Sequence, residues 1–319
     1  DWIATWEAAG KSVVVASLAD PWSLRAVPKA AGLVTTYDPS PASQLAVAAA
    51  LFGESAIGGR LPVSLAPRWE LGHGLAVDVR YGAPLSPVEP EEVGLSSEGL
   101  ERAGEILEQG IRDRAMPGAV ALVMRHGKIA LQRSWGRMSY EPSAPPMKVD
   151  TVFDLASLTK VIVTTTLSML QSERGNLNLE LPVSAYLPEL VGEEKSQITV
   201  ADLLTHSSGI LWWSDLYLRH GDLPPEEARR AYLEEIVALP LESVPGTEMR
   251  YSDLGILLLG EILERVTATP LDVAAQREIF DPLGMTETRF GPPAELLPRI
   301  APTELDSEWR GRMVHGEVH

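Results

Sequence analysis

The chain has 319 residues, 45% of them hydrophobic and 22% charged, a composition typical of one large or two ordinary globular domains. Its 27 Lys and Arg against 44 Asp and Glu give a net charge of -17, which argues against nucleic acid or an anionic membrane surface as a partner. The absence of cysteine excludes disulfides, thiol catalysis and Cys-based zinc sites. No apolar run reaches transmembrane length, and no basic-then-apolar leader opens the chain.

The first 75 residues predict a segment with a parallel sheet. A Val-rich strand is expected at residues 11–17 and a second strand at 32–37, and Pro39-Ser40-Pro41 opens a helix that runs through Leu51. Strands that alternate with a helix are typical of parallel α/β structure, although this segment is too short to be a complete domain.

This segment resembles the tail of the second, α/β domain of family-3 glycoside hydrolases, particularly the β-N-acetylglucosaminidases. The resemblance is carried by the Val-rich strand, Asp20-Pro21-Trp22, Tyr37…Ser40-Pro41 and Gly59-Arg60-Leu61-Pro62-Val63. It implies a first domain over residues 1–75. In that subgroup the chemistry belongs to a preceding barrel domain, so the resemblance assigns no catalytic residue to this chain.

A Pro-rich, acidic stretch at residues 76–95 predicts a linker between two domains. After it, Ser96-Ser97-Glu98 caps a helix, for which we expect an apolar stripe of Leu100, Ala103, Leu107 and Ile111. Residues 119–124 and 128–135, joined by His126-Gly127, then predict a β-hairpin.

Residues 153–160 open a long apolar helix that Gly175 ends. Ser157 is expected at or just inside the helix N-terminus, with Lys160 one turn further on the same face. A serine needs a base to take its proton. A lysine serves as that base where apolar surroundings and the positive end of the helix dipole lower its pKa. The helix start also offers a backbone N–H to a developing oxyanion. Taken alone, Ser-x-x-Lys is equally compatible with a Ser cap and a surface Lys.

Further motifs follow in the second half of the chain. Residues 199–204 predict a short capped helix, and a very apolar helix is expected from about Tyr251-Ser252-Asp253 to Val266. Between and after them lie Thr205-His206-Ser207-Ser208-Gly209, Pro245-Gly246 and Asp281-Pro282-Leu283-Gly284-Met285.

From about residue 92 onward the chain resembles the serine β-lactamase-like family, which holds class C β-lactamases, penicillin-binding D-Ala-D-Ala peptidases, D-aminopeptidases and related esterases. Five features carry the resemblance in order: Met116-Pro117-Gly118, Phe153 to Lys160, Leu203 to Gly209, Pro245-Gly246…Tyr251-Ser252 and Asp281 to Met285. The family fold is an antiparallel sheet flanked by helices together with a mainly helical subdomain. We therefore expect such a domain over residues 96–319, incomplete at its C-terminus.

The resemblance assigns catalytic roles residue by residue. Ser157 is the acylated nucleophile, Lys160 is its proton acceptor, and Tyr251 passes a proton to the leaving group and helps to activate water. A phenol does this where a nearby positive charge, here Lys160, lowers its pKa. The family's Tyr-x-Asn motif ends here in Asp253, a predicted substrate-binding residue. An ionised Asp accepts but does not donate a hydrogen bond, so Asp253 argues against amide recognition and favours an ester.

Besides Asp253, the chain differs from the family in a second way. The family has a Lys-Thr-Gly or His-x-Gly strand that supplies a second oxyanion donor, and this strand is expected beyond His319. The chain also starts at Asp1, so we expect it to be a fragment of a longer protein and a poor catalyst. Neither the residues nor the resemblance implies a cofactor or a metal. His206 is expected to be structural, the pair His315 and His319 does not match a zinc motif, and at most one of Trp212 and Trp213 is expected to face a ligand.

The resulting interpretation is an α/β segment joined by a linker to a serine hydrolase that acts on a cell-wall peptide, a β-lactam or an ester. The alternatives are a carboxylesterase, or a non-catalytic module that binds cell-wall fragments beside a glycosidase. Association with a glucosaminidase-like segment suggests a peptidoglycan-derived or other small substrate, and the resemblance implies a location outside the cytoplasm.

Overall fold

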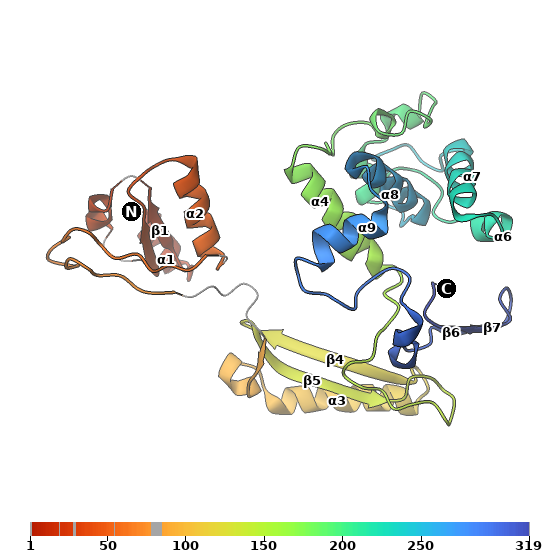
Figure 1. The fold of residues 1–319 in the computed structure, drawn as a ribbon, viewed down its shortest axis with the longest axis horizontal. Coiled ribbons are helices and arrows are strands. Elements are labelled where there is room, and N and C mark those ends of the chain that lie inside the picture. Colours follow the sequence, from red (N-terminus) through yellow and green to blue (C-terminus); the bar gives the residue numbers. More distant parts are fainter. Residues whose placement is uncertain (1, 19, 28–29, 54, 78–84, 319) are drawn as a thin grey trace. The chain divides into compact units, whose positions relative to one another are not determined.

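The computed structural model describes residues 2–18, 20–27, 30–53, 55–77 and 85–318 (Figure 1). These residues form two compact units. Unit 1 holds residues 1–87 together with 126–129, and unit 2 holds 88–125 together with 130–319. No helix in the described part of the chain is long and apolar enough to span a membrane.

Unit 1 contains the predicted parallel strands. β1 (Val14–Ser17) pairs in parallel with β2 (Gly32–Thr35), and α2 (Pro41–Leu51) follows. The Ser40 hydroxyl caps α2 by accepting a hydrogen bond from Ser43 N at 3.3 Å, as expected for a Ser that precedes an N1 proline. The strands and the helix are thus confirmed, whereas the resemblance of this segment to a glycosidase domain stays a prediction. The described part of unit 1 also contains the helices α1 (Trp2–Ala8) and η1 (Trp22–Ala26).

The linker expected at residues 76–95 is in part structured. Residues 78–84 lie outside the described residues. β3 (Ser86–Pro87) pairs in parallel with Lys128 and Ile129, and η2 (Pro90–Val93) is a 3₁₀ turn closed by a capping box between Glu89 and Glu92. Val93 is buried, with 8% of its surface exposed. The folded part of unit 2 therefore begins before residue 96. The capping box and the burial of Val93 order this segment in spite of its prolines.

α3 (Ser97–Arg112) packs next to the predicted hairpin of β4 (Gly118–Arg125) and β5 (Lys128–Gly136). The sheet order is β3-β5-β4. The stripe expected on α3 was wrong at one position, because Ala103 is exposed and Gly104 is the buried residue. A Cβ built on Gly104 would lie 3.2 Å from Trp135 Cζ2, so the missing side chain is what lets the ring of Trp135 approach the helix.

The rest of unit 2 is mainly helical. Its long elements are the π-helical segment η3 (Lys160–Thr165), α4 (Thr166–Glu173), α7 (Pro225–Ala238) and α8 (Asp253–Thr267). Shorter elements are η4 (Val183–Ala185), η5 (Lys195–Gln197), α5 (Val200–Leu204), α6 (Leu216–His220), α9 (Leu271–Ala275), η6 (Gln276–Phe280), η7 (Ala294–Arg299), β6 (Glu304–Asp306) and β7 (Arg312–Val314).

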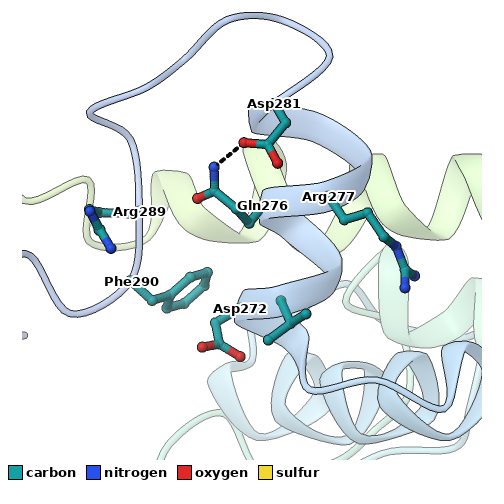
Figure 2. A pocket seen from close by; sticks show the side chains of 7 residues that line it. Asp272, Gln276, Arg277, Asp281, Arg289 and Phe290 are labelled. Carbon is teal, nitrogen blue, oxygen red and sulfur yellow. Dashed lines mark hydrogen bonds between the residues drawn. The ribbon is translucent and has the colours of Figure 1, made fainter.

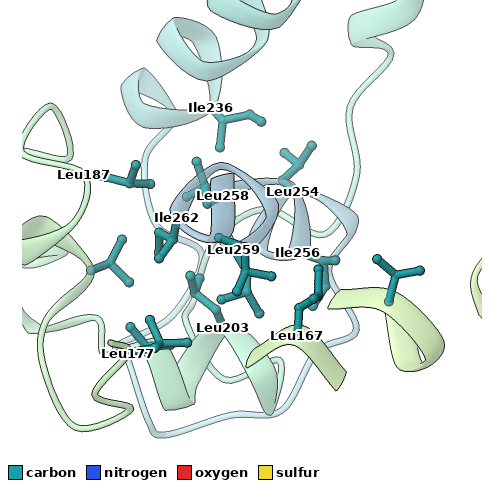
Figure 3. Packing of buried hydrophobic residues seen from close by; sticks show 14 of the residues in the cluster. Leu167, Leu177, Leu187, Leu203, Ile236, Leu254, Ile256, Leu258, Leu259 and Ile262 are labelled. Carbon is teal, nitrogen blue, oxygen red and sulfur yellow. The ribbon is translucent and has the colours of Figure 1, made fainter. Parts of the chain in front are cut away.

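The main core of unit 2 surrounds α8, which presents apolar side chains on most of its circumference (Figure 3). Leu259 and Ile262 are fully buried, and they belong to the same cluster as Leu167 of α4 and Leu203 of α5. A helix with so wide an apolar face is stable in water only when neighbours cover that face. The packing of α4 and α5 on α8 therefore fixes where the N-terminal ends of α8 and of the Lys160 segment lie relative to each other.

Candidate active site

Ser157 lies in a tight turn that leads into the helix. Leu158 N, Thr159 N and Lys160 N each bond to the carbonyl three residues earlier, at 2.9, 3.0 and 3.1 Å, and regular helix begins at Leu158. Residues 153–155 are not helical, so the expected start of the helix at Phe153 was wrong. Ala156 adopts φ 45, a left-handed conformation that L-residues rarely take. The turn tightens the chain immediately before Ser157 and leaves its side chain exposed.

Lys160 is directed at the hydroxyl of Ser157. Its Nζ donates a hydrogen bond to Ser157 Oγ at 2.9 Å, as the spacing of the two residues predicted. The lysine side chain is 19% exposed, so its stem is packed while its amine reaches the exposed hydroxyl. Lys160 also begins the π-helical segment, a wider turn that often occurs at functional sites.

The N-terminal end of α8 brings Tyr251 and Asp253 to the same amine. Asp253 Oδ1 lies 2.8 Å from Lys160 Nζ, and the centroid of the Tyr251 ring lies 5.1 Å from it. The Ser252 hydroxyl holds this end in place, because it accepts from Gly255 N and donates to Leu211 O, both at 3.0 Å. The structure therefore brings all four predicted site residues together, and it gives Asp253 a partner within the site.

The electrostatics of Lys160 differ from the expectation. Burial lowers the pKa of Lys160, but the carboxylate of Asp253 at 2.8 Å and the neighbouring Tyr251 raise it more, and the net pKa is raised. The predicted lowering of this pKa was wrong, because sequence spacing did not reveal a carboxylate at 2.8 Å from the amine. Lys160 is consequently held in its charged form at neutral pH.

His206 lies next to these four residues. From the sequence we expected only a structural role for it. Its Nδ1 accepts a hydrogen bond from Ser252 N at 3.1 Å, and its ring lies 4.7 Å from the ring of Tyr251. Burial and the charge of Lys160 lower its pKa, which favours the neutral imidazole that such an acceptor requires. His206 therefore supports the backbone on both sides of Tyr251, since its carbonyl also accepts from Arg250 N at 2.8 Å.

Three sequence candidates remain to be placed: His315, Trp212 and Trp213. Among the described residues no group of three His, Asp or Glu side chains forms a metal site, and His315 Nε2 contacts Ile300 O at 2.9 Å. Trp212 and Trp213 are 45% and 40% exposed, with ring centroids 6.0 Å apart.

A hollow of about 330 Å³ opens beside α9 and η6 (Figure 2). It is lined by Asp272, Val273, Gln276, Arg277, Asp281, Arg289 and Phe290. Ser157, Lys160, Tyr251 and Asp253 are not among the residues that line this hollow.

Comparison with known proteins agrees with this geometry. Residues 103–319 match the protein family described as Beta-lactamase. Esterase EstB of Burkholderia gladioli is 35% identical over 217 residues, covering 64% of this chain and 55% of the esterase. A putative D-alanyl-D-alanine carboxypeptidase of Salmonella heidelberg (strain SL476) is 31% identical over 248 residues, covering 72% of this chain and 57% of that protein.

Solved structures give the same picture of the fold. The crystal structure of a class C beta lactamase from Rhodobacter sphaeroides matches with a TM-score of 0.53 and 31% identity, covering 63% of this chain and 54% of that one. The fold of the matched region is therefore the mixed helix-and-sheet fold of these enzymes. The chain spans about half the length of the curated relatives that it matches.

Proposed function

Because the chain belongs to the beta-lactamase family of serine hydrolases, we propose that the protein hydrolyses its substrate through an acyl-enzyme on Ser157. The observation that carries this proposal is the 2.9 Å hydrogen bond between Lys160 Nζ and Ser157 Oγ at the start of an apolar helix. The hydroxyl is exposed to a substrate, while the amine beside it is largely shielded from water.

In the proposed first half-reaction, Lys160 in its neutral form takes the hydroxyl proton while Ser157 Oγ bonds to the substrate carbonyl carbon. The carbonyl oxygen becomes an oxyanion, which the Ser157 N–H at the helix start stabilises. When the oxyanion collapses, the bond to the leaving group breaks. The leaving group takes a proton from Tyr251, which recovers one from Lys160.

In the second half-reaction, water attacks the acyl carbon, and the bond from that carbon to Ser157 Oγ breaks. Tyr251 and Lys160 take one proton from the water and return one to Ser157 Oγ, so the enzyme is restored and the acid is released. The ring of Tyr251 lies 5.1 Å from Lys160 Nζ and 4.7 Å from the ring of His206, which places the phenol beside both.

Of the possible substrates, a carboxylic ester has a specific observation in its favour. Asp253 stands where the resemblance expects an Asn, and its carboxylate is ion-paired with Lys160 at 2.8 Å. An ionised carboxylate offers no donor to a substrate amide carbonyl, whereas an ester hydrolase needs none there. Cell-wall peptides and β-lactams remain the other substrates of this proposal, and a non-catalytic binding module is its alternative.

The proposal is tested by labelling the intact protein with a fluorophosphonate and mapping the modified peptide. We expect the label on Ser157, and we expect Ser157→Ala to lose both the label and the turnover of 4-nitrophenyl acetate. Ser207→Ala is the matched control, because this hydroxyl bonds to Asp202 at 2.9 Å and has no contact with Lys160. Label on another serine with Ser157 free would remove Ser157 from the mechanism, and a folded protein without label would favour the non-catalytic module.

A further inference from the structure

Four aromatic side chains of unit 2 form a continuous row, which we call the aromatic row: Trp212, Trp213, Tyr217 and Trp309. Neighbouring ring centroids lie 6.0, 6.4 and 4.8 Å apart in that order. Each side chain is 37–45% exposed, so all four present ring surface to solvent. Exposed aromatic surface that is contiguous, unlike single exposed apolar residues, marks a binding surface.

The row begins at the active site. Asp253 N donates a hydrogen bond to Trp212 O at 2.8 Å, and Asp253 Oδ1 lies 2.8 Å from Lys160 Nζ. The backbone that carries the first ring is therefore held by the same residue that holds the amine of the proposed base. The aromatic row is thus tied at one end to the residue that pairs with the amine beside Ser157.

The far end of the row is fixed by its own contacts. Trp309 N donates to Asp306 Oδ1 at 2.9 Å, and the guanidinium of Arg310 lies 4.1 Å from the centre of the Trp309 ring. A Cβ built on Gly221, directly after α6, would lie 3.4 Å from Trp309 Cζ2, so the end of α6 approaches this ring closely. These contacts hold the rings in place before a ligand binds. Ligand binding would therefore cost little free energy for ordering the aromatic side chains.

Charge decides what kind of ligand fits. Arg310 lies over the Trp309 ring, Arg219 follows Tyr217 in α6, and Arg250 precedes Tyr251 in the sequence. These three cations and Lys160 are each already ion-paired with a carboxylate of the protein, which disfavours a substrate carboxylate beside them. An uncharged apolar group, by contrast, gains from leaving water on contact with the rings.

We propose that the aromatic row is the subsite for the uncharged, apolar acyl chain of an ester substrate of Ser157. This inference rests on the proposed function. The acyl group occupies the site in both half-reactions, whereas the alcohol is released at the end of the first. Contacts along an extended row therefore act on the acyl group in both steps.

The test is a series of 4-nitrophenyl esters with the intact protein, in which the acyl chain lengthens from acetate to hexanoate and the leaving group stays constant. One methylene moved fully out of water is worth about fourfold in affinity, so hexanoate should exceed acetate by roughly tenfold or more in kcat/KM on half-exposed rings. Mono-4-nitrophenyl adipate has the same chain length with a terminal carboxylate, and we expect it to fall at least about tenfold below the hexanoate.

Variants assign the preference to the row. Trp213→Ala should reduce the hexanoate-to-acetate ratio about fivefold to tenfold, and Trp213→Phe, which keeps a ring, should restore most of it. Trp22→Ala is the matched control, because Trp22 is 50% exposed and belongs to unit 1. A ratio unchanged in Trp213→Ala, or a preference that follows the alcohol instead of the acyl chain, would overturn the inference.

The two proposals fail in different ways. Turnover that survives Ser157→Ala would remove the proposed function and the row's role with it. Turnover that requires Ser157 but favours the adipate or acetate ester would leave the proposed function intact and refute the subsite alone.

Discussion

Lys160 lies beside two groups that require different protonation states of its amine. As a base for Ser157 it has to be neutral, but the carboxylate of Asp253 at 2.8 Å favours its charged form. Burial alone lowers the pKa of Lys160, and the bonds to Asp253 and Tyr251 reverse that effect. The pH dependence of acylation is therefore set at this residue by the balance between burial and one carboxylate.

Replacing Asp253 by Asn should move the acid limb of the acylation profile to lower pH. The wild-type pKa of Lys160 is raised, so its reactive neutral form gains population only as pH rises. Asp253→Asn removes the carboxylate, burial then lowers the pKa, and the neutral form appears at a lower pH. The measurement is the rate of fluorophosphonate labelling against pH.

The matched control for this shift is Glu242→Gln, which removes a carboxylate bound to Arg250 at 2.7 Å, beside Tyr251 but without a bond to Lys160. Its profile should follow the wild type. An acid limb of Asp253→Asn that stays in place would show that Asp253 does not control the protonation of Lys160.

Tyr251→Phe should slow the removal of the acyl group more than its formation. The variant keeps the ring beside Lys160 and His206 but loses the hydroxyl proposed to pass protons to and from water. Loss of a positioned acid–base group typically costs about 10²–10⁴-fold. Intact-protein mass spectrometry during turnover should show an acyl-enzyme that persists. Tyr140→Phe, whose hydroxyl bonds to Arg114 O, is the control, and an unchanged lifetime in Tyr251→Phe would exclude the role.

At the scale of elements, the turn between β6 and β7 is organised by one carboxylate. Asp306 accepts hydrogen bonds from Glu308 N, Trp309 N and Arg310 N and from the Arg310 guanidinium. These bonds lower the pKa of Asp306 from 3.8 to about 2. The turn sets Trp309 against Tyr217, with ring centroids 4.8 Å apart, so it also sets the end of the aromatic row.

The turn between β6 and β7 should become less ordered at acid pH. The pKa of Asp306 is lower in the folded protein than in the unfolded chain. Its carboxylate therefore stabilises the turn fully above pH 3.8, and this stabilisation is lost as pH falls through about 2. The indole N–H resonance of Trp309 should shift over that interval in the wild type. In Asp306→Asn the shift should be absent and the resonance should already be displaced at pH 7. Identical titrations of the two proteins would contradict this account.

At the scale of the whole chain, the core around α8 decides whether the site exists. Ser157 and Lys160 belong to one segment, and Tyr251 and Asp253 stand at the start of α8, which α4 and α5 hold by apolar packing. Leu259 and Leu167 are both 0% exposed, so neighbouring groups surround each of these side chains. The distance between the amine and the carboxylate is therefore a consequence of core packing.

Leu259→Ala should lower the free energy of unfolding by about 2–5 kcal/mol, because it leaves a cavity in a fully buried cluster. Leu257→Ala lies on the same helix with 48% exposure and should change it by about 0.5 kcal/mol or less. Urea unfolding followed by circular dichroism measures both. Similar losses in the two variants would show that α8 is not packed as described.

The sequence by itself determined the local parts of this protein. The Ser157–Lys160 contact follows from helical spacing, and the cap of α5 follows from Thr199 and Asp202, which bond reciprocally as their types predict. The hairpin of β4 and β5 and the parallel pair β1 and β2 were predicted for the same reason. The serine–lysine contact and the cap of α5 depend on neighbours within a few residues, and the paired strands lie close together in the sequence, so few alternatives exist.

Only the tertiary structure decided the contacts between distant segments. The ion pair of Lys160 with Asp253, the hydrogen bond from Ser252 N to His206 and the meeting of Tyr217 with Trp309 join residues far apart in the sequence. The first two depend on how α4, α5 and α8 fill one core, and the third depends on how the turn after β6 meets α6. Spacing along the chain carries no information about such packing. For this reason the sequence predicted the contact of Lys160 with Ser157, whereas the direction of the pKa shift of Lys160 emerged only from the fold.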